Sequence, residues 1–140
     1  MIKVYRLNTQ LLVIEELAMS KIIRLDEAET RKALGGTLKV LFTPETANTQ
    51  FSRCSMGYFS PGEQLAPHIH PESEEVYYVI QGRGTVYLGE DLEEVPVEPH
   101  MGLYVPPGLV HGVKNTGDER LLIAFFVAPG KEASQIFHKD

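Results

Sequence analysis

The stretch GEQLAPHIHPESEEVYYVIQG, residues 62–82, holds two histidines one residue apart, three acidic residues just after them, and then an apolar run. Side chains of a strand alternate between its two faces, so His68 and His70 point the same way if this stretch is extended. The next strand begins with Glu75 after the turn-forming PESE. A hairpin can therefore bring the Glu75 carboxylate beside both imidazoles.

Two imidazoles and one carboxylate suit a divalent ion such as Mn, Fe, Co, Ni or Zn, whereas calcium prefers oxygen ligands throughout. The alternative is that each histidine is a surface residue or a hydrogen-bonded core residue. His111 follows the rigid turn VPPGLV, which can direct its side chain to the same interior. His138 lies two residues from the end and is expected to be a solvated tail residue.

The composition indicates one ordinary globular domain. The chain has 140 residues, 43% hydrophobic and 23% charged, with a single cysteine, Cys54, which we expect to be a buried thiol. The formal net charge of -6 argues against nucleic acid or an anionic membrane surface as the main partner. A small-molecule substrate or ligand fits this charge better.

No segment is expected to cross a membrane. The longest apolar runs, LLIAFFVA (121–128) and LLVIEELAM (11–19), are far shorter than the ~20 residues that span a bilayer. The N-terminus MIKVYRLNTQ lacks the uninterrupted apolar stretch of a signal peptide. We therefore expect a cytoplasmic protein.

One short helix is predicted near the N-terminus, over residues 27–34. Asp26 as N-cap with Glu29 three positions later forms a capping-box pattern, and the pair Gly35 and Gly36 provides a C-terminal stop. LLVIEEL, residues 11–17, can be a helix turn or an extra strand, since its periodicity fits both.

From residue 37 onward the chain predicts many short strands. Segments such as VYYVIQ, GTVYLG and LLIAFFVA are rich in Val, Tyr, Phe and Ile, and glycine- or proline-containing turns separate them. With little helix to cover parallel crossovers, this pattern indicates an antiparallel sandwich or barrel. We therefore predict an N-terminal extension at 1–36, with the short helix, and a β-barrel domain at 37–140.

Two separated motifs resemble those of the cupin family. The first motif is matched in full by Gly62, His68, His70, Glu75 and Gly82. The second ends in a part that is matched by Pro106, Gly108, His111 and Asn115. The opening glycine of the second motif is replaced by His100, with Gly102 two residues later, so that turn can be built differently; His100 is expected to be a surface turn residue, with an extension of the pocket as the alternative.

The resemblance implies an all-β fold, a double-stranded β-helix or jelly-roll barrel with a metal inside near one mouth. The metal ligands that it implies are His68, His70, Glu75 and His111. Three neutral imidazoles and one carboxylate leave an octahedral ion with two open positions for water, substrate or dioxygen, as a catalytic metal requires. Glu72 and Glu74 are not motif positions and are expected to be solvated.

Strand parity predicts which residues lie near that metal. Gln64 shares the face of His68, and Tyr77 shares that of Glu75, so these two polar residues are the predicted catalytic side chains. A barrel-filling role is the alternative for Tyr77. On the preceding strand, Arg53, Met56 and Tyr58 are further pocket residues whose inward face the pattern does not decide, and Arg53 is an anion anchor if it points inward.

Three functions fit the sequence. The first is a metal-dependent enzyme on a small organic molecule, by analogy with cupin dioxygenases, decarboxylases, isomerases and cyclases. The second is a non-catalytic module that binds a sugar or metabolite, and the third is a barrel with a mainly structural metal. A homodimer is expected, because the apolar side of the N-terminal extension needs a partner surface.

Overall fold

The computed structural model describes residues 3–7, 10–14 and 21–140. Nearly all regular structure in this part of the chain is extended, as expected from short segments of β-branched and aromatic residues. The elements are β1 (Lys3–Leu7), β2 (Gln10–Ile14), β3 (Glu29–Ala33), β4 (Gly36–Phe42), α1 (Pro44–Ala47), β5 (Arg53–Phe59), β6 (Gln64–Ile69), β7 (Glu74–Gln81), β8 (Gly84–Leu88), β9 (Glu93–Val97), β10 (Gly102–Val105), β11 (His111–Lys114), β12 (Leu121–Ala128) and β13 (Gln135–Ile136).

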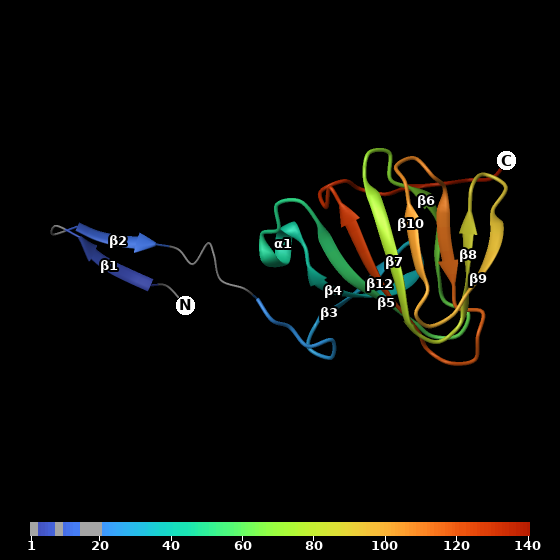
Figure 1. The fold of residues 1–140 in the computed structure, drawn as a ribbon, viewed down its shortest axis with the longest axis horizontal. Coiled ribbons are helices and arrows are strands. Elements are labelled where there is room, and N and C mark those ends of the chain that lie inside the picture. The colour runs from blue at the N-terminus through green and yellow to red at the C-terminus, as the bar shows by residue number, and fades with distance from the viewer. Residues whose placement is uncertain (1–2, 8–9, 15–20) are drawn as a thin grey trace.

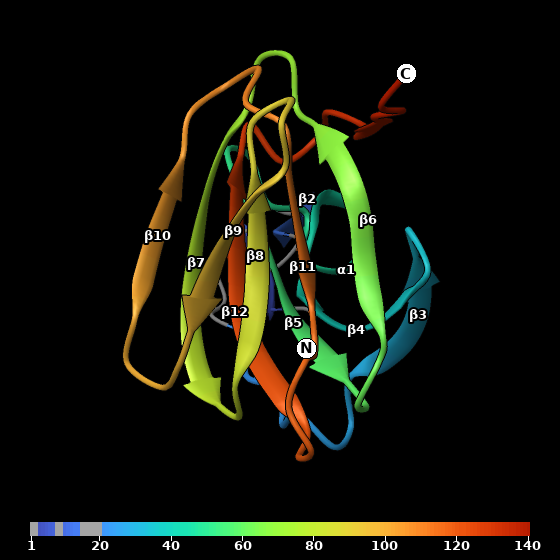
Figure 2. The same ribbon diagram turned by 90° about the vertical axis from the view of Figure 1, so that its right-hand side faces the viewer.

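Two antiparallel sheets face each other and enclose the core (Figures 1 and 2). One sheet has the strand order β10-β7-β12-β5-β4-β3, and the other has the order β13-β6-β11-β8-β9. Strands close in sequence, such as β6 and β7, lie in different sheets, as in a jelly roll. The predicted all-β double-stranded β-helix is therefore confirmed.

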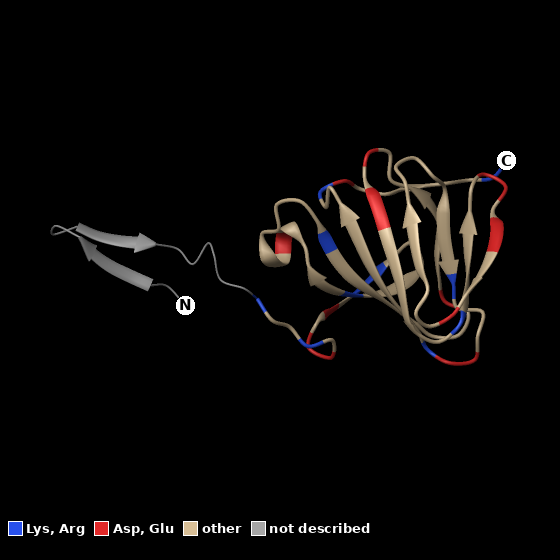
Figure 3. Cartoon of the chain, in the orientation of Figure 1, with Lys and Arg blue, Asp and Glu red and all other residues tan. Residues whose placement is uncertain are grey.

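Alternation along β7 shows how the sequence forms the core. Glu75, Tyr77 and Val79 are buried, whereas Val76 and Tyr78 between them are exposed on the outer face of the sheet. The buried core comprises Phe59, Leu65, Tyr77, Val79, Val86, Val97, Val113, Leu121, Ile123 and Phe125. Many of the charged residues lie instead in the loops that join strands (Figure 3).

The helix predicted over residues 27–34 is wrong. Glu29–Ala33 forms β3, which pairs antiparallel with β4, so the glycines expected to stop a helix lie at a hairpin turn instead. Asp26 accepts hydrogen bonds from the Arg24 side chain, at 3.1 Å from its Nε. Pairing with β4 outweighs a capping-box pattern because a short isolated helix has little stability of its own.

The N-terminal region forms a hairpin in which β1 pairs antiparallel with β2. The second of these strands covers part of LLVIEEL, for which helix and strand were both open. The predicted packing of the extension on the barrel or on a partner subunit depends on residues outside the described ranges and stays a prediction. β3, although within residues 1–36, belongs to the six-stranded sheet. No helix in the described ranges is long and apolar enough to span a membrane.

Two turns show where the backbone conformation constrains the residue type. Gly82, after β7, has φ +81, and a Cβ atom there would overlap the backbone carbonyl oxygen of Arg120. His100 has φ 72, the left-handed conformation that glycine adopts most easily. Its backbone nitrogen donates to Val79 O at 2.8 Å, and its exposed side chain lies 3.2 Å from the Tyr78 hydroxyl. His100 is thus a surface turn residue, as expected.

Cys54 is only partly buried, so the expectation of a buried thiol is wrong. It lies on β5 opposite Phe126 of β12, and Phe126 is exposed. His138 is exposed, as predicted.

Candidate metal centre

Four side chains from three strands and one turn converge inside the barrel. His68 lies on β6 and His70 just after it, Glu75 lies on β7, and His111 begins β11. The pairing of β11 with β6 places His111 directly opposite His68. All four residues are buried, and the ligand atoms that they offer lie within 4.8 Å of one another. The four side chains that the sequence predicted are therefore together.

The Glu75 carboxylate is the centre of the cluster. Its Oε2 atom lies 2.9 Å from His111 Nε2 and 3.1 Å from His70 Nε2. The His68 ring centroid lies 4.2 Å from that of His111. These ring nitrogens and the carboxylate oxygen are close enough to ligate one divalent ion together.

Backbone carbonyl groups orient two of the imidazoles. His68 Nδ1 lies 2.7 Å from Ala66 O, and His111 Nδ1 lies 2.8 Å from Leu109 O. A carbonyl oxygen only accepts, so Nδ1 of each ring carries the proton and the Nε2 lone pair is available on the other side of the ring. This donor set fits a divalent transition metal such as Zn, Mn or Fe.

The charges of the cluster also favour a cation. Burial and the neighbouring His111 lower the pKa of His68 to about 4, so this ring is neutral at pH 7 and able to bind a metal. Burial alone raises the pKa of Glu75, but the close contacts with the His111 and His70 rings outweigh it and bring the pKa to about 2. The site therefore offers an ionised carboxylate beside imidazole nitrogens.

The turn between His70 and Glu75 is held from outside the cluster. The Glu132 carboxylate accepts hydrogen bonds from the backbone nitrogens of Glu72, at 2.8 Å, and Ser73, at 2.6 Å. Ser73 Oγ also donates to Pro129 O at 2.8 Å. Sequence reasoning missed Glu132 because it lies 60 and 59 positions along the chain from Glu72 and Ser73, the residues that it holds. The side chains of Glu72 and Glu74 are exposed, as predicted.

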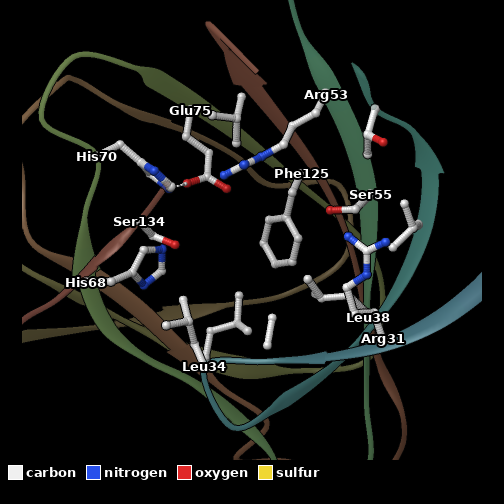
Figure 4. Close-up of a pocket in the computed structure, with 15 residues that line it drawn as sticks. Arg31, Leu34, Leu38, Arg53, Ser55, His68, His70, Glu75, Phe125 and Ser134 are labelled. Atoms are coloured by element: carbon white, nitrogen blue, oxygen red, sulfur yellow. Dashed lines mark ion pairs between the residues drawn. The ribbon is translucent and has the colours of Figure 1, made fainter. Parts of the chain in front are cut away.

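A pocket of about 180 Å³ opens beside the cluster. Figure 4 shows His68, His70 and Glu75 on one side of it, with Phe125 in the middle and Ser55 and Arg31 on the far side. The lining residues are Arg31, Ala33, Leu34, Leu38, Val40, Thr43, Arg53, Ser55, Leu65, His68, His70, Glu75, Phe125, Val127 and Ser134. Three members of the cluster, His68, His70 and Glu75, thus face a small cavity whose walls are partly apolar and partly polar.

Residues 56–137 match the sequence profile of a known family, whose description is "Cupin domain". That range covers more than half of the chain. The chain is a cupin. It is 32% identical over 120 residues to "Polyketide synthase CurC" of Streptomyces cyaneus, covering 86% of this cupin and 77% of that protein.

Solved structures agree with this fold. A conserved protein with a double-stranded β-helix domain from Klebsiella pneumoniae is 25% identical, with a TM-score of 0.73, and covers 86% of this cupin and 100% of that chain. The polyketide cyclase RemF from Streptomyces resistomycificus also has a TM-score of 0.73, at 20% identity, and covers 87% of this cupin and 88% of that chain. The second similarity bears on the fold alone.

The predicted inward orientation of Gln64 is wrong. Its side chain is exposed, and Leu65 lines the pocket instead. Between the pairs His111–His68 and Val113–Leu65, β6 has one residue more than β11, so the strand contains a bulge. A bulge of one residue reverses which side chains face inward, and simple alternation from His68 therefore fails.

Tyr77 faces inward and is 1% exposed. Its ring centroid lies 6.1 Å from that of His111 and 4.6 Å from that of Phe125. The hydroxyl has no hydrogen-bond partner among the described residues. Burial, together with the negative charge of Glu75, raises the pKa of Tyr77 well above its usual value, so the phenol stays protonated at pH 7.

The strand β5 presents Arg53 and Ser55 to the pocket. Met56 and Tyr58 lie at the alternate positions of the strand, and Arg120 Cζ lies 3.8 Å from the centroid of the Tyr58 ring. The sequence did not decide which face of this strand points into the pocket, and the structure shows that it is the face of Arg53.

Proposed function

We propose that this cupin is a metal-dependent enzyme that acts on a small organic carbonyl compound. The observation that carries the proposal is the buried cluster of His68, His70, Glu75 and His111, three of whose side chains line a pocket of about 180 Å³. A structural metal needs no pocket beside it, whereas a catalytic metal needs space for a substrate in its open positions.

The four side chains would hold one divalent transition metal, with Zn, Mn, Fe, Ni and Co as the ions to test. Such an ion, when bound, polarises a carbonyl oxygen and stabilises the negative charge that develops on it. The protein would supply the remaining conditions. Three neutral imidazoles and one carboxylate would leave a bound divalent ion with a net positive charge, and the apolar side chains on part of the pocket wall lower the local polarity.

Ring closure of a chain with three or more carbonyl groups is the reaction that we propose first. A proton leaves the carbon between two of the carbonyl groups, that carbon forms a bond to a third, more distant carbonyl carbon as its C=O π bond breaks, and the oxygen of that third carbonyl gains the proton. The similarity to a protein named as a polyketide synthase supports this choice. The protonated phenol of Tyr77 is the side chain that we propose to donate a hydrogen bond to the substrate or to a water molecule near His111.

The test is turnover of a panel of linear poly-β-ketones with at least three carbonyl groups, followed by the absorbance of the cyclised product. The protein is purified, depleted of metal by a chelator, and reloaded with one ion at a time. We expect activity to disappear on depletion and to return with one ion. His111→Ala should lose both metal and activity, while Glu74→Gln should retain both, because Glu74 is exposed and lies outside the cluster.

Other outcomes distinguish the remaining functions. Consumption of O₂ during turnover would replace ring closure with an oxygenase reaction. Ligand binding that survives metal removal, with no turnover, would indicate a binding module. Unfolding on metal removal, again with no turnover, would indicate a structural metal. The homodimer and the cytoplasmic location predicted from the sequence stay predictions.

A further inference from the structure

Arg53 lies in the same row of the six-stranded sheet as Glu75 of the metal cluster. Val127 of β12 pairs with Arg53 of β5 on one side and with Glu75 of β7 on the other. Paired residues of neighbouring strands direct their side chains to the same face, and all three of these residues line the pocket. Two strand spacings, roughly 10 Å, separate the Cα atoms of Arg53 and Glu75, with the short side chain of Val127 between them. The long arginine side chain can therefore extend toward Glu75.

The second arginine of the pocket lies elsewhere. In Figure 4 the Arg53 guanidinium is beside the Glu75 carboxylate, whereas Arg31 is on the opposite side of the pocket. The register agrees, because Arg31 pairs with Leu38, which pairs in turn with Gly57. Gly57 is four residues along β5 from Arg53, a distance of roughly 13 Å. Of the two arginines that line the pocket, Arg53 is thus the one at the metal cluster.

Backbone carbonyl groups hold the Arg53 guanidinium in place. Its Nη1 atom donates to Glu132 O at 3.1 Å and to Gly130 O at 3.5 Å. The Glu132 carboxylate accepts hydrogen bonds from two backbone nitrogens of the turn before Glu75. A single residue therefore links the position of Arg53 to that of the metal cluster, so the guanidinium is oriented before any ligand binds.

The positive charge of Arg53 is held in place but is not neutralised. In the described part of the chain, no carboxylate oxygen lies within 4 Å of its nitrogens. Glu75 Oε2 instead contacts His70 Nε2 at 3.1 Å and His111 Nε2 at 2.9 Å. The carbonyl groups that accept from Nη1 are uncharged, and they leave Nε and Nη2 of Arg53 without a described partner. A partly buried cation in this state is costly, so an anionic oxygen of a ligand would stabilise it.

The charges around this end of the pocket also favour a negative ligand. Glu75 would offset one of the two charges of a divalent ion in the cluster, and Arg53 adds a further positive charge beside it. Arg31, at the other end, has Glu29 as a partner at 3.1 Å. An oxyanion is therefore attracted to the Glu75 end of the pocket rather than to the Arg31 end.

We propose that Arg53 binds the negatively charged oxygen of the substrate's enolate and thereby makes the carbon between two carbonyl groups more acidic. This inference rests on the proposed function, in which that carbon loses a proton. When the C–H bond breaks, its electron pair is shared between the two carbonyl oxygens, and the proton passes to water. The Nε–H and Nη2–H groups of Arg53 would donate to these oxygens.

A guanidinium suits this role for two reasons. Charge-assisted hydrogen bonds are about twice as strong as neutral ones, and the planar fork of two N–H groups fixes the direction of the ligand. The enolate carries a full charge, whereas the neutral dicarbonyl does not. The contact with Arg53 therefore stabilises the deprotonated form more than the neutral form, which is the difference that lowers a pKa.

Acetylacetone tests the inference without turnover, because it has two carbonyl groups and cannot close a ring onto a third. Its enolate absorbs at a longer ultraviolet wavelength than its neutral forms, so a pH titration gives the apparent pKa of the bound molecule. We would titrate zinc-loaded and metal-depleted protein. The variants are Arg53→Gln and Arg53→Lys, and the matched control is Arg31→Gln, which removes the other arginine of the same pocket. Thermal melts and elemental analysis check folding and metal content.

We expect Arg53→Gln to raise the apparent pKa of bound acetylacetone by at least about one pH unit, which corresponds to a tenfold loss of enolate binding. Arg53→Lys keeps the charge without the planar fork, so it should restore part of this difference. Arg31→Gln should leave the pKa unchanged. If Arg53→Gln lowers the metal content, the same comparison between the metal-depleted samples applies.

A second measurement uses the wild-type chain, because Arg53 also holds the segment after β12 and its replacement can disturb the fold. In protein with ¹⁵N-labelled arginine, the Nε–H signals of Arg53 and Arg31 are assigned as those missing from Arg53→Lys and Arg31→Gln. Saturation with acetylacetone, at a pH where it binds as the enolate, should shift the Arg53 signal and leave the Arg31 signal in place.

Three results would overturn the inference. They are no binding of acetylacetone by the wild-type protein, an Arg53 Nε–H signal that does not move at saturation, and a pKa that is the same in wild type and folded Arg53→Gln or that changes equally in Arg31→Gln. Failure of the proposed function has a different signature. It would be an absence of poly-β-ketone turnover in a protein whose Arg53 still lowers the pKa of bound acetylacetone.

Discussion

Replacement of Glu75 by Gln removes the one negative charge of the metal cluster and keeps the shape of the side chain. Residues that only orient metal ligands cost about 10–100-fold in metal affinity when they are changed. Glu75 is itself a proposed ligand, and its Oε2 atom lies 2.9 and 3.1 Å from two of the imidazoles. We therefore expect Glu75→Gln to raise the metal dissociation constant by at least about 100-fold.

This loss converts to a thermal shift that can be measured. With metal at a thousandfold excess over its dissociation constant, binding stabilises the wild-type protein by about 4.1 kcal/mol. A hundredfold weaker site retains about 1.4 kcal/mol under the same conditions. The difference of about 2.7 kcal/mol corresponds to about 9 °C in Tm for a chain of this size.

The assay compares Tm with and without metal for wild type, Glu75→Gln and the control Glu74→Gln. Glu74 is the neighbouring residue, and its carboxylate accepts a hydrogen bond from the Tyr104 hydroxyl at 3.1 Å. The metal-free Glu75→Gln protein is expected to melt lower too, because it loses charge-assisted hydrogen bonds, so the increment in Tm on metal addition is the quantity to compare. An increment equal to that of wild type, with unchanged metal content, would refute the assignment of the cluster as a metal site.

Other predictions concern the fold and the pocket. Gly82→Ala combines a positive φ with a clash against the backbone of Arg120, so it should lower the free energy of unfolding by about 2 kcal/mol or more in urea titrations; Gly89→Ala, with φ +74 but no atom within 4 Å of the added Cβ, should cost about 1 kcal/mol. If Gly89→Ala lowered the free energy of unfolding more than Gly82→Ala, this reasoning would be contradicted. Hydrogen bonds from Lys32, Thr37 and Ser60 lower the pKa of Glu63 to about 2 from 4.5, so this stabilisation is complete above pH 4.5 and lost as the pH falls through 2. Glu63→Gln should therefore destabilise the protein by about 1 kcal/mol at pH 7, a small cost because water screens the exposed Lys32. Below pH 2 the same substitution should have no effect. A destabilisation that does not change with pH would show that the carboxylate is not its cause. Tyr77→Phe removes a buried hydroxyl that has no described partner, so Tm should stay equal or rise while turnover of the poly-β-ketone panel falls; unchanged turnover would remove Tyr77 from the proposed mechanism.

Much of the metal cluster was predictable because its geometry is local. His68, His70 and Glu75 lie within eight residues of one another, and the alternation of a strand and the length of one turn bring them together. His111 could be added because a rigid Pro-Pro-Gly turn precedes it and the motif spacing resembles that of a known family. The exposed positions of Glu72 and Glu74 follow from the same alternation.

Predictions failed where a long-range contact outweighed a local pattern. The capping-box pattern at Asp26 and Glu29 predicts a helix, but the pairing of β3 with β4 decides for a strand. Gln64 points outward because of a bulge in β6, which is visible only in its register with β11. Neither the capping-box segment nor the segment around Gln64 carries a sequence signal that reveals the competing contact.

The sequence alone was sufficient for the all-β class, the approximate strands and the grouping of His68, His70 and Glu75, because these depend on spacings of a few residues that strand geometry converts directly into direction. His111, far along the chain, was added through the resemblance of its motif to that of a known family. Only the tertiary structure decided that Arg31 and Arg53 line the same pocket and that Glu132 holds the turn before Glu75. Those residues come from strands and segments distant in sequence, and their neighbours are set by the order of strands in the sheets. Strand order depends on which faces can be buried together, and no local pattern records it.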